Sequence, residues 1–144
     1  MTDPLLAGDA LARRAALVLA VPLQAALGAR LLDDADPAAG IVLPVGELAD
    51  GGAGGAHAGA LAVGMEAAAL LAALPSLTVA EHAVSVSTAV TLPAQAPRGH
   101  DVVFRGTLDR RTGRSAFTSV VAACDGIVVA RAQIVKAVVR APAP

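Results

Sequence analysis

Hydrophobic residues along the chain follow two different spacings, and the change falls at Pro75. In residues 4–27 we predict helical turns, because apolar residues recur at roughly helical intervals, at Leu5, Leu6, Leu11, Ala15, Leu19 and Leu23. A kink or restart is expected at Pro22, since proline removes a backbone donor and crowds the preceding turn. Short strands are predicted at residues 28–32 and 41–45, the second being rich in branched residues.

Residues 51–74 form the most distinctive stretch of the chain. A glycine-rich loop leads through His57 into a segment of little but Ala, Gly, Leu, Val and Met, which Pro75 should end. A helix that is apolar on every side belongs in a protein interior. Glu66 lies in its middle, where an ionised carboxylate without partners would cost several kcal/mol or have its pKa raised. We interpret Glu66 as a catalytic carboxylate; the alternative is a salt-bridged structural residue.

After Pro75 the pattern becomes that of strands. Residues 84–92 alternate, which places Val84, Val86, Thr88, Val90 and Leu92 on one predicted face. Further strands are predicted at residues 102–108, 116–123 and 127–139, and Asp125-Gly126 is a two-residue hairpin signal. One apolar helix followed by antiparallel strands indicates an α+β fold with the sheet curved around the helix. We expect the remaining sheet face or edge to pack on a second subunit.

The 144 residues are enough for one domain with its own core. We predict an N-terminal helical segment at residues 1–27, a main domain at residues 28–140 and a disordered tail at residues 141–144. Arg13 and Arg14 followed by an apolar run resemble a secretory signal, but they lie late in the sequence, and Gln24 interrupts the run. A native amphipathic helix, no membrane span and a cytoplasmic location are therefore preferred.

The amino-acid composition limits the kinds of core and of binding site that the chain can form. The chain is 56% hydrophobic and 1% aromatic, so the core must consist of Ala, Val and Leu. A net charge of −1 gives no basic excess for binding nucleic acid. The single cysteine, Cys124, excludes an internal disulfide and any Cys-based zinc site, and we predict no bound metal. Its place at a strand end indicates a small buried or edge residue rather than a nucleophile.

One segment, HAGALAVGMEAAA, resembles the His-Gly-Gly-Ala motif of hotdog-fold acyl-CoA thioesterases of the phenylacetyl-CoA and 4-hydroxybenzoyl-CoA kind. In that family an acidic residue follows the histidine by nine positions, as Glu66 follows His57 here. The likeness extends over residues 20–139, through PLQAALGARLL, TAVTLPAQAPRG, GRSAFTSVV and DGIVVARAQ. It implies a hotdog fold, in which a curved antiparallel sheet of five to six strands wraps around one long central helix, with an additional N-terminal helix.

The resemblance implies hydrolysis of an acyl-CoA thioester, with no cofactor beyond the CoA of the substrate. Glu66 would act as nucleophile or as general base. The amides of Ala58 and Gly59, at the positive end of the helix dipole, would bind the thioester oxygen. In an apolar surround Glu66 should be a stronger base than a solvated glutamate. The alternative is a non-catalytic hotdog dimer that binds an acyl-CoA or another acyl ligand.

Three further residues are candidates for substrate binding. His57 begins the helix and is expected mainly in a structural role, with substrate contact as the alternative. The family often has Asn or Gln six residues before this histidine, where the present chain has Gly51; Asp50 beside it is a candidate substitute. Arg114, after the glycine of a predicted turn, is a candidate contact to the CoA phosphates. Ala58 replaces the second motif residue, a glycine.

The spacing of the candidate residues also predicts an assembly. Ala58 and Glu66 are eight residues apart, which is about 12 Å along one helix. Both cannot reach one carbonyl carbon, so they must come from two subunits related by a two-fold axis. We therefore predict a homodimer with active sites at its interface, and a dimer of dimers (homotetramer) as the full assembly.

Overall fold

The computed structural model describes residues 2–141. The last three residues of the predicted disordered tail, 142–144, lie outside the described residues. The helices and strands are α1 (Gly8–Ala20), α2 (Pro22–Ala26), β1 (Arg30–Leu31), η1 (Pro37–Ala39), β2 (Ile41–Pro44), α3 (Ala58–Ala73), η2 (Leu74–Ser76), β3 (Glu81–Thr91), β4 (Asp101–Arg111), β5 (Ser115–Cys124) and β6 (Ile127–Arg140), where η denotes a short 3-10 helix.

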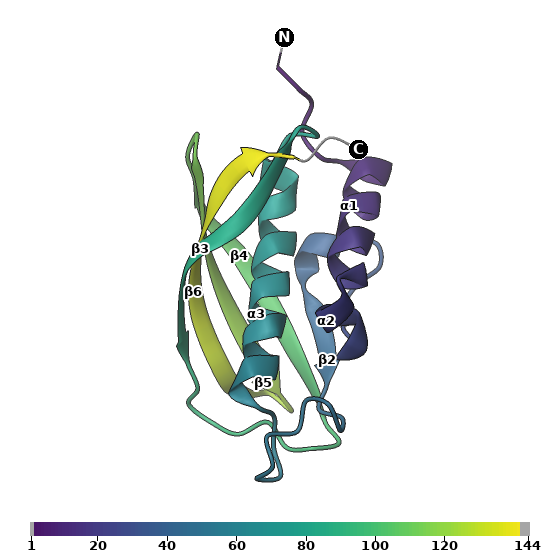
Figure 1. The fold of residues 1–144 in the computed structure, drawn as a ribbon, viewed down its shortest axis with the longest axis vertical. Helices are drawn as coiled ribbons and strands as arrows, with labels where there is room; N and C mark the ends of the chain where they lie inside the picture. Colours follow the sequence, from purple (N-terminus) through teal and green to yellow (C-terminus); the bar gives the residue numbers. More distant parts are fainter. Residues whose placement is uncertain (1, 142–144) are drawn as a thin grey trace.

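The six strands form one antiparallel sheet in the order β1-β2-β4-β5-β6-β3. The long strands curl around α3, which runs along the inside of the sheet from the glycine-rich loop to the start of β3 (Figure 1). This is the hotdog fold, and it confirms the α+β prediction. Pro75 lies in η2, so the helix changes to 3-10 geometry where proline was expected to end it.

Small residues let the central helix approach the sheet closely. Met65 and Leu71 are fully buried on the sheet side of α3, and Phe104 of β4 fills the space over Gly64. A Cβ added at Gly106 of β4 would lie 2.5 Å from the backbone oxygen of Ala68. The core is built mainly of Ala, Val and Leu, as the composition requires.

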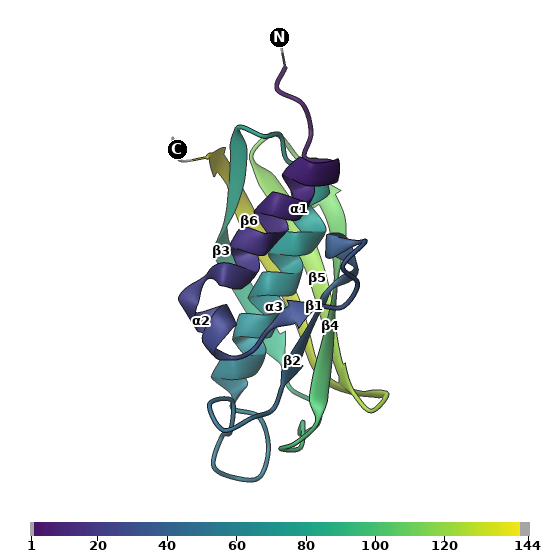
Figure 2. The same ribbon diagram turned by 90° about the vertical axis from the view of Figure 1, so that its right-hand side faces the viewer.

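The N-terminal helix is part of this core. Helix α1 lies along α3 (Figure 2) and buries Ala15 and Val18. The guanidinium of Arg14 donates hydrogen bonds to the backbone oxygens of Glu81 and Val79, which fixes α1 to the start of β3. The predicted break at Pro22 is confirmed, since α1 ends at Ala20 and α2 begins with this proline.

By length and composition, the segment Ala58–Ser76 is long and apolar enough to cross a membrane. In this structure the same segment is the central helix of the hotdog fold and lies between the sheet and α1 (Figures 1 and 2).

A β-bulge interrupts the alternation predicted for residues 84–92. In the ladder with β6, Ser85 pairs with Lys136 and Ser87 with Val135, so Val86 is the extra residue. The prediction that Val84 shares a face with Thr88 is therefore wrong: the two lie on opposite faces of the sheet. The bulge instead places Ser85 and Thr88 together on the face toward α3.

Candidate functional site

Glu66 lies at the open edge between α3 and β3, and its side chain is 34% exposed. Both carboxylate oxygens accept hydrogen bonds. The Ser85 hydroxyl donates to Oε2, and the Thr88 hydroxyl donates to Oε1 over 2.6 Å. Because the bulge at Val86 turns both hydroxyls toward the helix, the local irregularity of β3 is what holds this carboxylate in place.

Lys136 of β6 completes the cluster, and sequence reasoning missed it. Its Nζ lies 3.2 Å from Oε2 of Glu66 and donates over 2.7 Å to the Ser85 hydroxyl. The lysine side chain is only 3% exposed. Its position two residues after the inward-facing Ile134 was the available signal, since a lysine on the buried face of a strand needs a carboxylate partner.

The pKa of Glu66 differs from the one that the sequence led us to expect. Burial alone would raise the pKa of Glu66, but the hydrogen bonds from Ser85 and Thr88 and the ammonium of Lys136 outweigh it. The pKa of Glu66 therefore lies below its ordinary value, and the expectation of a stronger base is wrong for this structure. Burial lowers the pKa of Lys136, while Glu66 partly opposes that change. Glu66 is an oriented, ionised carboxylate at neutral pH.

The first two amides of α3, those of Ala58 and Gly59, differ in their hydrogen bonding. His57 is the N-cap residue, and its Nδ1 accepts a hydrogen bond of 2.8 Å from the Gly59 amide. His57 thus makes the helix-capping contact expected of a structural residue. The Ala58 amide makes no hydrogen bond within residues 2–141. Of the two predicted oxyanion donors, only the Ala58 amide is free to donate to a new partner within the described residues.

Two apolar hollows flank Glu66 along the partly exposed side of α3. One, of about 380 Å³, is next to the start of the helix and is lined by Leu23, Leu27, Leu48, His57, Gly59, Ala60 and Val63. The other, of about 290 Å³, lies between α1 and α3 and is lined by Arg14, Leu17, Val18, Val21, Gln24, Leu70 and His82. Val63, Glu66 and Leu70 follow one another at helical spacing, so the carboxylate lies between the two hollows.

Asp50 lies next to the helix start, where the backbone of Ala49 accepts a hydrogen bond from His57. Its carboxylate accepts a hydrogen bond of 2.8 Å from the Gly52 amide and forms an ion pair of 2.6 Å with Arg98. The Gly52 hydrogen bond, followed by Arg98, lowers the pKa of Asp50. The structure thus brings Asp50 to the helix start, with its carboxylate already engaged.

Arg114 does not lie near the helix start of its own protomer. It belongs to the turn between β4 and β5, and its backbone oxygen accepts from Val138 near the end of β6. This turn is at the end of the sheet where α3 ends (Figure 1). The neighbouring Arg111 forms an ion pair with Glu81 at the start of β3.

No protein-family model and no curated protein matches the sequence. Solved structures do match. A thioesterase from Haemophilus influenzae is 13% identical, with a TM-score of 0.77 over 86% of this chain and 87% of its own. A mutant of the phenylacetic acid degradation protein PaaI from Thermus thermophilus is 24% identical, with a TM-score of 0.71 over 81% of this chain and 97% of its own.

A third match is a Streptococcus mutans protein bound to acetyl-CoA. It is 15% identical, with a TM-score of 0.63 over 72% of this chain and 82% of its own. At these identities the matches show that the chain shares the hotdog fold of solved thioesterases.

Proposed function

We propose that this protein is an acyl-CoA thioesterase in which Glu66 is the catalytic carboxylate. The observation that carries the proposal is the setting of Glu66: one ionised carboxylate in an apolar helix, oriented by Ser85, Thr88 and Lys136, at an open edge between two apolar hollows. The shared fold with solved thioesterases, and the acetyl-CoA bound by one of the matching proteins, support the same reaction class.

Because two hydroxyls and an ammonium hold the carboxylate of Glu66 in one orientation, we propose that it acts as the nucleophile rather than as a general base. A carboxylate oxygen attacks the thioester carbonyl carbon, and the carbon–sulfur bond breaks to release CoA as its thiol after protonation from solvent. Water then hydrolyses the mixed anhydride to give the free acid and the original carboxylate. A nucleophile must be ionised and well placed, which the cluster provides.

The second half of the site would come from a second copy of the chain. The separation of Ala58 and Glu66 along α3 is about 12 Å, too far for both to act on one carbonyl carbon. Among residues 2–141 the outer edge of β3 has no strand partner. This edge carries Val86, which is 64% exposed, as well as Val84 and Val90. An unpaired apolar edge strand favours pairing with another chain.

We propose that two copies pair through β3, which carries the hydroxyls that bind Glu66, so the carboxylate of one copy faces the helix start of the other. The Ala58 amide of that copy would bind the developing oxyanion. The packing of α1 on the core supports an N-terminal helix that is part of the folded domain, and the location that we propose is cytoplasmic. A dimer of dimers is the proposed full assembly.

One observation favours a second candidate, the non-catalytic acyl-ligand dimer. Both oxygens of Glu66 are occupied by partners within the chain, as a purely structural ion pair would require. A thiol-release assay over a panel of acyl-CoAs separates the two. The thioesterase proposal predicts turnover that Glu66→Gln abolishes while CoA binding persists. Tight acyl-CoA binding without turnover by the wild type would favour the binding protein, and equal hydrolysis by both proteins would refute the role of Glu66.

A further inference from the structure

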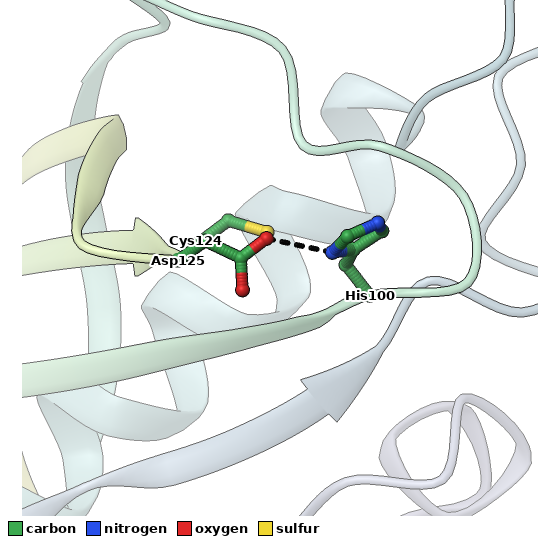
Figure 3. Close-up of side chains that lie close together, drawn as sticks. All are labelled: His100, Cys124 and Asp125. Atoms are coloured by element: carbon green, nitrogen blue, oxygen red, sulfur yellow. Dashed lines mark hydrogen bonds and ion pairs between the residues drawn. The ribbon is translucent and has the colours of Figure 1, made fainter.

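Three possible metal ligands meet away from the proposed active site. The side chains of His100, Cys124 and Asp125 lie together beside the turn between β5 and β6 (Figure 3). One ligand atom from each lies within 4.8 Å of the others. His100 Nδ1 is 2.6 Å from Asp125 Oδ2, and the Cys124 side chain is buried beneath them. Within the described residues, none of the three forms a side-chain hydrogen bond or ion pair with Glu66 or with the first residues of α3.

The backbone holds these residues from two separate segments. Cys124 is the last residue of β5, and Asp125 opens the hairpin turn with a φ of 50°. His100 ends the loop before β4. Its backbone oxygen accepts a hydrogen bond of 2.9 Å from the Val45 amide, and the Gly99 amide donates one of 2.9 Å to the backbone oxygen of Val45. The cluster is therefore anchored by the sheet on one side and, on the other, by the loop that pairs with Val45, the residue after β2.

The ligand types match one class of ion. Thiolate, imidazole and carboxylate are the ligands of zinc, and three protein ligands leave a fourth position for water. The carboxylate of Asp125 also places a negative charge beside the thiol, which favours a bound cation.

We propose that His100, Cys124 and Asp125 bind a divalent ion of the zinc class, which ties the loop before β4 to the β5–β6 turn. Binding forms the metal–sulfur bond and releases the thiol proton to solvent, while the imidazole and the carboxylate each give one ligand atom. The sequence predicts no bound metal and no Cys-based zinc site, because it has one cysteine. The proposed site needs only one thiol, and the fold brings His100, 24 positions earlier in the sequence, next to it.

The probe is the metal alone, added to the reduced full-length protein. We expect one Zn²⁺ per protomer by equilibrium dialysis, and Co²⁺ should produce a near-ultraviolet thiolate-to-metal band. Cys124→Ala should abolish the band, and Asp125→Asn should weaken Zn²⁺ binding at least about tenfold by removing a ligand charge. Asn tolerates a positive φ, so this variant keeps the turn. His82→Gln is the control, since it removes a histidine outside the cluster.

Further readouts keep the result independent of folding. Zn²⁺ should raise the thermal midpoint of the wild type and of His82→Gln, but not that of Cys124→Ala. Circular dichroism without metal should be the same for all four proteins. The proposal is overturned if Co²⁺ gives no thiolate band with the wild type, or if Cys124→Ala binds Zn²⁺ as tightly as the wild type does. Equal affinity of Asp125→Asn and the wild type would remove Asp125 from the ligand set and would also refute the proposal.

Discussion

The ammonium nitrogen of Lys136 lies 3.2 Å from Oε2 of Glu66, across the space between β6 and the central helix. The lysine is almost completely buried, so it needs this carboxylate; the carboxylate in turn keeps its charge because the lysine and two hydroxyls surround it. A buried pair of this kind is costly to break from one side, since the remaining charge then lacks a partner.

Replacing the lysine should therefore change the pH dependence of the reaction. Wild-type Glu66 has a lowered pKa, so it stays ionised to lower pH than an ordinary glutamate does. Lys136→Met removes the ammonium, raises the pKa of Glu66 and should move the acidic limb of kcat/KM to higher pH. The measurement is a pH–rate profile, with Lys136→Arg as the charge-retaining control. Superimposable wild-type and Lys136→Met profiles would show that the pair does not control the carboxylate.

The two hydroxyls on β3 should also affect the rate. Thr88→Val keeps the shape of the side chain but removes the hydrogen bond to Oε1, and should lower kcat about tenfold if that bond orients the nucleophile. Ser87→Ala is the matched control, because Ser87 lies on the opposite face of the same strand. Steady-state kinetics with one acyl-CoA suffices. Equal kcat values for the two variants would contradict an orienting role for Thr88.

Much of this architecture follows from local patterns. The run of small apolar residues in α3 requires a buried helix, and its single carboxylate at Glu66 is visible in the sequence. The hairpin at Asp125-Gly126 is also local, and the structure gives both residues a positive φ. These features depend on neighbours a few positions apart, which is why spacing alone predicts them.

The parts that escaped prediction depend on pairing between distant segments. The bulge at Val86 is defined by its register against β6, so strict alternation wrongly assigned the faces of β3. Lys136 is 70 residues from Glu66, and the pairing of Asp50 with Arg98 spans 48 residues. An inward-facing lysine was readable from its strand, but only the fold identifies its partner.

A proline substitution can test the oxyanion donor at the helix start. Ala58 is the first residue of α3, where proline is well tolerated, and His57 before it already has the extended conformation that proline requires (φ −64°, ψ 137°). Ala58→Pro should therefore remove only the amide donor. It should lower kcat by about 10²–10³-fold and leave the free energy of unfolding unchanged. Ala58→Gly, which keeps the amide, is the control. Full activity of Ala58→Pro would exclude this amide as a donor.

The role of His57 can be separated into capping and substrate contact. His57→Ala loses the hydrogen bond to Gly59 and should cost about 1 kcal/mol of unfolding free energy. His57→Asn supplies another capping side chain and should restore that stability. If the histidine only caps the helix, KM will be unchanged in His57→Asn. A raised KM in this stable variant would instead indicate substrate contact. Urea unfolding and steady-state kinetics provide the two readouts.

The central claim is that Glu66 of one subunit and the helix start of the other form one active site. Its most direct test is to coexpress Glu66→Gln and Ala58→Pro subunits with different tags and to assay thiol release by the purified mixed dimer. Each variant alone should be nearly inactive. The mixed dimer should recover about half of the wild-type rate, because one of its two sites has both intact halves. A mixed dimer as inactive as its parents, or a chain that hydrolyses acyl-CoA as a monomer, would contradict the account.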